Sequence, residues 1–255
     1  MPHVDAALRN AGHELALLPD GVSDDELASA LREAELLLMC YTPLTARVIE
    51  AAPRLKGIVK YGVGIDAIDI EAAKARGIPV VNVPDYAEET VAEGAMTLML
   101  ALAKKLKPIQ RAMDEQGWVW PASQWLGLDL AGKTLGLVGL GRIGAKVARM
   151  AGRGFRMRVL GFDPHADAAR FEQAGVQRCA ELRELLAHSD FVSVHCVLND
   201  ATRGLIGSSE LAAMKPSAFL INVSRGAIVD DAALLHALQE QHIAGAALHL
   251  AHTIT

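Results

Sequence analysis

The sequence has few aromatic residues and no long apolar run. Aromatic side chains make up 4% of its 255 residues, whereas hydrophobic residues make up 51% and charged residues 22%. These proportions are typical of a globular protein whose core is built from aliphatic side chains. The most apolar stretch, residues 95–103, ends at Lys104 and is too short to cross a bilayer. We therefore expect a soluble protein that does not span a membrane.

The charge balance and the cysteines exclude further classes. The formal net charge is −5, which gives no basic face for a nucleic acid. Cys40, Cys179 and Cys196 lie far apart and lack the spacing of metal ligands, so we predict no metal site. The first residues show no basic segment followed by an apolar one, so no signal peptide is expected. A reducing, cytoplasmic compartment fits these features best.

Short apolar runs alternate with amphipathic helical patterns along the chain, which indicates βαβ units and a parallel sheet. A capping box, Ser23 to Glu26, opens a helix near the start, and Asp69 caps another. Residues 89–105 form a long helical pattern, and residues 108–130, which hold all three tryptophans, are interpreted as a hinge between domains. Strands are expected at 14–18, 36–40, from 58, and at 79–83, 134–138, 158–163, 191–195, 219–223 and 246–248.

A glycine motif follows the expected strand at 134–138. It reads Gly139-Leu140-Gly141-Arg142-Ile143-Gly144 and opens a helical pattern. In such a motif the first glycine makes the tight turn, the second lets the backbone approach a pyrophosphate, and the third lets helix and strand pack closely. The diphosphate then lies at the positive end of the helix. The motif predicts a dinucleotide-binding domain.

An acidic residue lies at the spacing that such a domain requires. Asp163 comes 19 residues after Gly144, at the end of the next expected strand. An acid at this position accepts hydrogen bonds from the adenosine ribose and repels a 2′-phosphate, so NAD is favoured over NADP. The alternative is that Asp163 only caps the loop before Pro164.

A third motif, residues 221–226, ends another expected strand. Ligands of open α/β sheets bind at this edge, so Arg225 is expected to project into a cleft. Its guanidinium suits the carboxylate and carbonyl oxygens of a 2-oxo or 2-hydroxy acid. From composition alone, a surface salt bridge is the alternative role.

Four ordered motifs within residues 5–248 resemble the D-isomer-specific 2-hydroxyacid dehydrogenases, a family that includes the C-terminal-binding-protein corepressors. The motifs are Tyr61-Gly62-Val63-Gly64-Ile65-Asp66, Gly132 to Gly144, Val194-His195-Cys196 with Thr202 to Ile206, and Met214 to Asp230. The resemblance implies an NAD-dependent oxidoreductase that transfers hydride between NAD(H) and a small 2-hydroxy or 2-oxo acid. It also implies a homodimer built through the second domain.

The resemblance assigns roles to individual residues. The amides around Val63 and Gly64 would hold the substrate carboxylate, and Arg225 would be the catalytic arginine that polarises the C2 oxygen. The cofactor would be held by Gly139, Gly141, Arg142, Ile143, Gly144, Asp163, His195, Cys196, Thr202, Val223, Ser224 and Arg225. For His195, structural support of its loop is the alternative role.

The chain departs from the family pattern near both ends. His249 stands where the family has an aspartate that contacts the nicotinamide amide, and the catalytic glutamate is expected near Ile254, where no acid lies. The catalytic histidine of the family would come after Thr255. The first strand of the family is also missing, so we expect a truncated chain with impaired catalysis and exposed apolar strands at 36–40 and 80–83.

The predicted fold class is α/β: a Rossmann doubly wound parallel sheet plus a smaller, incomplete flavodoxin-like α/β domain. Residues 1–88 are the incomplete substrate (catalytic) domain, 89–130 the interdomain helix and linker or dimer arm, and 131–255 the NAD-binding Rossmann domain. Two other functions remain open: an NAD(H)-binding regulator without turnover, similar to the corepressors, and a non-functional fragment.

Overall fold

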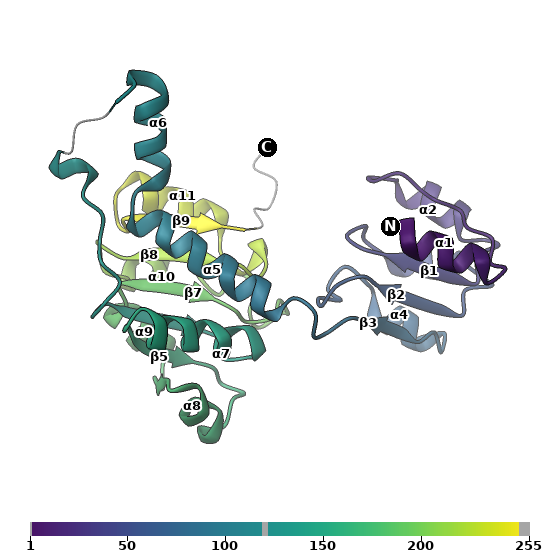
Figure 1. The fold of residues 1–255 in the computed structure, drawn as a ribbon. Helices are drawn as coiled ribbons and strands as arrows, with labels where there is room; N and C mark the ends of the chain where they lie inside the picture. Colours follow the sequence, from purple (N-terminus) through teal and green to yellow (C-terminus); the bar gives the residue numbers. More distant parts are fainter. Residues whose placement is uncertain (1, 119–121, 250–255) are drawn as a thin grey trace. The chain divides into compact units, whose positions relative to one another are not determined.

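The computed structural model describes residues 2–118 and 122–249. The chain forms two compact units, Met1–Tyr86 and Ala87–Thr255 (Figure 1). In both units parallel strands alternate with helices, which confirms the predicted α/β class with two sheets. No helix in the described part of the chain is long and apolar enough to cross a membrane.

The first unit has a parallel sheet of strand order β1-β2-β3. Its apolar core holds Leu44, Val48, Ile49 and Ile58, which are almost completely buried. Both expected helix caps are present at Ser23 and Asp69. The elements are α1 (Pro2–Asn10), α2 (Asp24–Ala30), β1 (Leu36–Met39), α3 (Ala46–Glu50), β2 (Gly57–Lys60), α4 (Ile70–Ala75) and β3 (Val80–Asn82).

The strand predicted at residues 14–18 is wrong, because this segment has no regular secondary structure. Leu17 is 69% exposed and Leu18 is 43% exposed. Apolar residues at consecutive positions 15–18 lack the alternation of a strand with one buried face. The segment therefore finds neither a pairing strand nor a core.

The second unit has six parallel strands in the order β6-β5-β4-β7-β8-β9. Chain order reverses between β4 and β7, and the crevice at such a switch point is where open α/β sheets bind ligands. The strands are β4 (Thr134–Val138), β5 (Arg158–Phe162), β6 (Gln177–Arg178), β7 (Phe191–Val194), β8 (Phe219–Asn222) and β9 (Gly245–Leu248). Their order is that of a doubly wound Rossmann sheet.

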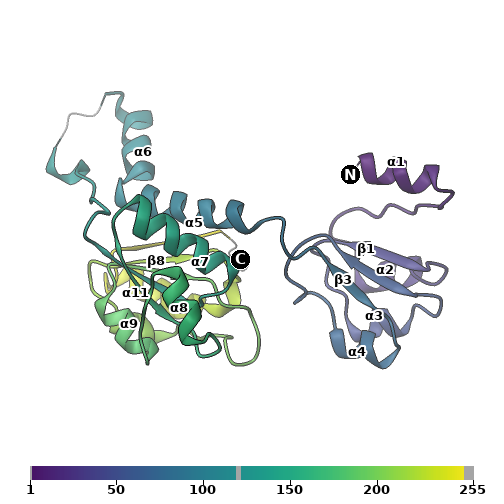
Figure 2. The ribbon, with the colours of Figure 1, turned by 60° about the horizontal axis from the view of Figure 1, so that its bottom comes forward.

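Helices cover both faces of this sheet (Figures 1 and 2). One face packs on α5 (Glu88–Ala103), α7 (Arg142–Arg149) and α8 (Ala168–Ala174), and a π-helical turn, η2 (Met150–Gly154), extends α7. The other packs on α9 (Leu182–His188), α10 (Ser208–Ala213) and α11 (Asp231–Gln239). The remaining elements are α6 (Leu106–Gln116), η1 (Ser123–Trp125) and η3 (Gly226–Ile228).

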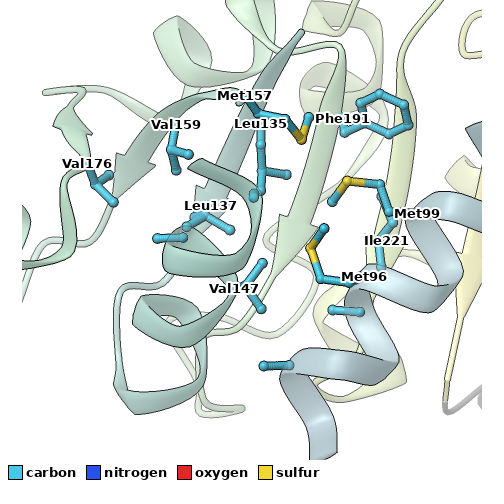
Figure 3. Close-up of a cluster of buried hydrophobic side chains, with 14 of the residues drawn as sticks. Met96, Met99, Leu135, Leu137, Val147, Met157, Val159, Val176, Phe191 and Ile221 are labelled. Carbon is cyan, nitrogen blue, oxygen red and sulfur yellow. The ribbon is translucent and has the colours of Figure 1, made fainter. Parts of the chain in front are cut away.

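The long helix α5 belongs to the core of the second unit. Its Met96 and Met99 point toward Ile221 of β8 (Figure 3). Met99 is completely buried, as are Leu135 and Leu137 of β4 in the same cluster. Because α7 follows β4 after a short turn, it starts at the carboxyl edge of the sheet, and an ion pair between Arg142 and Glu88 joins its first turn to that of α5.

Candidate dinucleotide-binding site

The glycine motif forms the turn from β4 into α7. Gly139 has a φ of 97°, a left-handed conformation that favours glycine. A Cβ atom on Gly139 would lie 2.6 Å from the backbone nitrogen of Cys196, and one on Gly144 would lie 2.5 Å from the carbonyl oxygen of Gly139. The first and third glycines are therefore required by backbone packing within the protein.

Gly141 is different, because nothing in the protein requires a glycine there. It is the N-cap of α7 with φ −70° and ψ −163°, which other residues also adopt. A Cβ atom on Gly141 would meet no protein atom within 4 Å. The open space before the first turn of a helix is where the diphosphate of a dinucleotide approaches, so the residues present fit such a ligand.

Asp163 lies directly after β5 and is tied to the glycine motif. Its Oδ2 accepts a hydrogen bond of 2.8 Å from the Leu140 amide. Its Oδ1 accepts from the amides of His165 at 2.9 Å and Ala166 at 3.2 Å. The carboxylate therefore orders its own loop and the turn after β4, and Oδ2, which accepts a single hydrogen bond, keeps acceptor capacity for a ribose hydroxyl.

The side chain of Arg142, in the first turn of α7, contacts a residue that the sequence analysis did not identify. Its Nε lies 3.1 Å from Oε1 of Glu88, in the first turn of α5. Lys146 and Arg149 on the next turns of α7 pair with Glu89. Glu88 and Glu89 followed no motif in the sequence, so only the packing of the two helices could reveal this network.

His195 lies directly after β7, beside Gly144 of α7, and is half-buried. Its Nε2 lies 2.9 Å from Oγ of Ser193, and its Nδ1 is buried with no hydrogen-bond partner among the described residues. Burial lowers the pKa of the imidazole from 6.5 to about 4, so the ring is neutral at pH 7. The position matches the loop that was predicted, and a cofactor contact of His195 stays a prediction.

Cys196 and Ser224 join the loops after β7 and β8. The hydroxyl of Ser224 donates to the carbonyl oxygen of Cys196. Burial raises the pKa of the Cys196 thiol to about 11, with a smaller contribution from Asp163, so this residue is a neutral thiol. Val223 precedes Ser224 and is 8% exposed.

The turn that holds Arg225 is fixed by a buried amide, Asn222, at the end of β8. Asn222 Nδ2 donates to the Arg225 carbonyl at 2.9 Å, and its Oδ1 accepts from the Ser224 amide at 2.9 Å. Arg225 is half-buried, and its Nη1 donates to the Ser224 carbonyl at 3.0 Å. The His249 amide donates to the Asn222 carbonyl, which places His249 beside this turn.

Thr202 orders the loop after β7. Its hydroxyl donates to the Val197 carbonyl at 2.6 Å and accepts from the Asn199 amide at 2.8 Å. These bonds show a role in loop structure, and contact with a cofactor stays a prediction. Ile143 is half-buried behind the glycine turn, and the position near Ile254 lies outside the described residues.

Val63 and Gly64 belong to the first unit, in the loop after β2. Asn82 Nδ2 donates to the Val63 carbonyl at 2.7 Å, and Gly62 has a φ of 147°. The loop lies at the carboxyl edge of its own parallel sheet. The role of Val63 and Gly64 in substrate binding stays a prediction.

Taken together, the second unit brings Gly139, Leu140, Asp163, His195, Cys196 and Ser224 to one edge of a sheet of Rossmann order. This fold and this site define a dinucleotide-binding domain. Comparison with known proteins gives the family. Its sequence model, described as the D-isomer specific 2-hydroxyacid dehydrogenase NAD binding domain, matches residues 96–252.

Similar proteins agree with this match. D-3-phosphoglycerate dehydrogenase of Methanocaldococcus jannaschii is 41% identical over 229 residues, which are 89% of this chain and 43% of that protein. Glyoxylate reductase of Korarchaeum cryptofilum is 42% identical over 221 residues, 86% of this chain and 66% of that protein. The chain thus spans somewhat less than half of the first relative and about two thirds of the second.

Solved structures share the fold. D-lactate dehydrogenase of Aquifex aeolicus, complexed with NAD and lactic acid, has a TM-score of 0.85 at 33% identity and covers 98% of this chain and 73% of its own. An acyclic imino acid reductase complexed with NADPH and D-Arg has a TM-score of 0.89 at 28% identity, covering 99% of this chain and 80% of its own. The chain belongs to the D-isomer specific 2-hydroxyacid dehydrogenase family, and its second unit is the NAD-binding domain of that family.

Proposed function

We propose that this chain is part of an NAD-dependent oxidoreductase that transfers hydride between NAD(H) and a small 2-hydroxy or 2-oxo acid. The observation that carries the proposal is the glycine turn, in which Gly139 and Gly144 are required by the protein and Gly141 leaves space for a ligand. NAD, when bound, supplies the hydride acceptor and NADH the donor. Family membership and the relatives named above support the substrate class.

Different residues of the chain bind the cofactor and the substrate. The turn after β4 and the start of α7 bind the diphosphate, while Asp163 binds the adenosine ribose. The half-buried, neutral thiol of Cys196 and the turn 223–225 shield the nicotinamide side from water. Arg225 polarises the C2 oxygen of the substrate by donating hydrogen bonds, and the amides of Val63 and Gly64 hold its carboxylate.

This assignment makes residues 1–88 the substrate domain, 89–130 the interdomain helix and dimer arm, and 131–255 the cofactor domain. A homodimer is supported by apolar side chains on and beside α6: Leu106 is 56% exposed, Trp118 75% and Leu126 67%. We place the protein in the cytoplasm, where its free thiols stay reduced. Sedimentation of the purified chain tests the dimer.

The first prediction concerns Asp163. Asp163→Asn removes the charge that binds the ribose diol, and we expect NADH affinity to fall about tenfold or more. Fluorescence titration of the purified chain with NADH measures it. Asp167→Asn is the matched control, because Asp167 caps α8 through the Arg170 amide and asparagine is an equally good cap.

Three outcomes are distinguishable. NADH binding weakened by Asp163→Asn and not by Asp167→Asn, with oxidation of NADH in the presence of a 2-oxo acid such as glyoxylate, supports an oxidoreductase. Binding of NADH without turnover of any small 2-oxo acid would contradict the oxidoreductase activity and leave only a protein that binds NAD(H). A folded wild-type chain that does not bind NADH would contradict it entirely.

A further inference from the structure

Arg170, on α8, is a cation that the sequence motifs did not identify and that the proposed mechanism does not use. It is half-buried, and its Nε donates a hydrogen bond of 3.1 Å to the carbonyl oxygen of Leu140. Leu140 lies between the first two glycines of the motif and is 1% exposed. A buried peptide of the glycine turn therefore fixes the position of the Arg170 side chain.

The same residue connects Arg170 to the acid that binds the ribose. The Leu140 amide donates to Asp163 Oδ2, and the Leu140 carbonyl accepts from Arg170 Nε. Arg170 and Asp163 are thus both hydrogen-bonded to the backbone of one residue. Across the described ranges, no carboxylate lies within ion-pair distance of the Arg170 guanidinium, although Asp163 is so near.

Asp163 and Arg170 have opposite effects on the binding of a ribose 2′-phosphate. Asp163 repels it, but three amides already donate to the Asp163 carboxylate, and donors of this kind reduce the effective charge that a ligand meets. A guanidinium whose charge no carboxylate neutralises attracts phosphate, and an arginine near the ribose acid is the group that accommodates a 2′-phosphate in Rossmann domains.

We propose that Arg170 is a specificity-determining residue through which the site accepts NADP(H) in addition to NAD(H). The proposal rests on the proposed function. The hydrogen bond to Leu140 uses Nε, so the two terminal nitrogens of the guanidinium keep their donors for phosphate oxygens. Asp163 makes NAD(H) the preferred cofactor. Arg170 makes the difference in affinity between NAD(H) and NADP(H) smaller than Asp163 alone would cause.

One opposing charge lies close by. Asp167 caps α8, and its Oδ1 accepts from the backbone amide of Arg170 at 2.9 Å. This carboxylate contacts the main chain of Arg170 and makes no ion pair with its guanidinium, so its interaction with α8 is retained when the side chain is changed. Asp167→Asn is therefore expected to improve NADPH binding slightly, which is the opposite direction from a loss at Arg170.

The experiment is a pair of titrations, with NADH and with NADPH, on the wild-type chain and on Arg170→Ala, Arg170→Lys and Arg183→Ala. We expect wild-type affinity for NADPH within about a hundredfold of that for NADH, and a further loss of about tenfold for NADPH in Arg170→Ala, since an arginine–phosphate hydrogen bond is a strong one. NADH affinity should change less than about twofold. Arg170→Lys should restore part of the NADPH affinity, and exposed Arg183 on α9 is the control.

The pattern across the variants separates the roles. Selective loss of NADPH in Arg170→Ala, diminished at high salt because the phosphate contact is charged, supports the proposal. Equal losses for both cofactors would show that Arg170 only supports the glycine turn and would overturn it. Wild-type binding of NADH with no binding of NADPH would also overturn it while leaving the proposed function intact. A failure to bind NADH would contradict both.

Discussion

Gly141 and Gly144 belong to one motif but are glycines for different reasons. Gly144 is buried, and its hypothetical Cβ overlaps the carbonyl oxygen of Gly139 at 2.5 Å, an atom of the backbone that cannot move away. Gly141 faces open space. The sequence motif treats the two positions alike, and only the structure separates a packing requirement from a requirement of the ligand.

A prediction follows for the packing of Gly144. Gly144→Ala forces α7 away from the turn after β4, and overpacking of this kind costs about 1–3 kcal/mol of unfolding free energy. Urea denaturation monitored by circular dichroism measures it. Gly152→Ala is a control within η2, because its Cβ would lie 3.6 Å from Val159, an ordinary contact. Equal stability of Gly144→Ala and wild type would contradict the packing argument.

A second prediction at this scale concerns His195 and pH. Its pKa is about 4 in the folded chain and 6.5 as the ordinary value. The imidazole of His195 binds a proton more readily in the unfolded chain than in the folded one. The free energy of unfolding is therefore not reduced by this group above about pH 6.5, and it falls as the pH is lowered toward 4. The loss amounts to about 3 kcal/mol, an order-of-magnitude figure from the shift.

Unfolding free energies at pH 7 and pH 4.5 test this, with His195→Asn as the comparison. The variant has no imidazole to protonate, so its stability should fall less between the two pH values than that of wild type. The same fall in both proteins would show that other groups cause the acid sensitivity. The ring pairs with Ser193, so a uniform loss of stability in the variant at both pH values is expected and does not affect the comparison.

At the scale of elements, α5 is part of the fold of the second unit. Met99 is completely buried in the cluster that includes β4, β8 and α7 (Figure 3). Met99→Ala should therefore lower the unfolding free energy by about 2–5 kcal/mol. Met113→Ala on α6 should cost far less, because Met113 is 40% exposed. Thermal unfolding of both variants measures the difference, and equal effects would contradict this view of α5.

The elements also show what could be predicted from the sequence. The strand at 134–138 was predicted with its observed bounds, because an apolar run ended by a glycine turn allows few other structures. The strand β6 was not predicted: Gln177 and Arg178 are both exposed and carry no apolar pattern. The helix α8 was also missed, although Asp167 caps it, and with it the position of Arg170.

The sequence also predicted part of the candidate site. Gly139, Gly144 and Asp163 have a spacing that the chemistry of the fold determines, and the structure brings them to one edge of the sheet. Contacts between segments far apart in the sequence, such as Glu88 with Arg142, follow from helix packing and leave no local pattern. Such contacts could not be predicted from spacing alone.

At the scale of the whole molecule, two compact units divide the chain near Tyr86. The first unit exposes apolar side chains on its sheet, with Leu36 54% exposed and Val81 56% exposed, as predicted for these strands. Exposed apolar surface of this kind favours association with other proteins or with further copies. The second unit contains the residues proposed to bind the cofactor, so ligand binding should stabilise it directly.

Thermal unfolding of Gly141→Ala with and without NADH tests whether the turn after β4 binds NAD(H). Because the added methyl group meets no protein atom, we predict that the variant melts at the wild-type temperature in the absence of cofactor. Because that methyl group occupies the approach of the diphosphate, it should weaken NADH binding at least about tenfold, so NADH should raise the melting temperature of the variant much less than that of wild type. Equal stabilisation of both proteins by NADH would show that the turn after β4 does not bind the diphosphate.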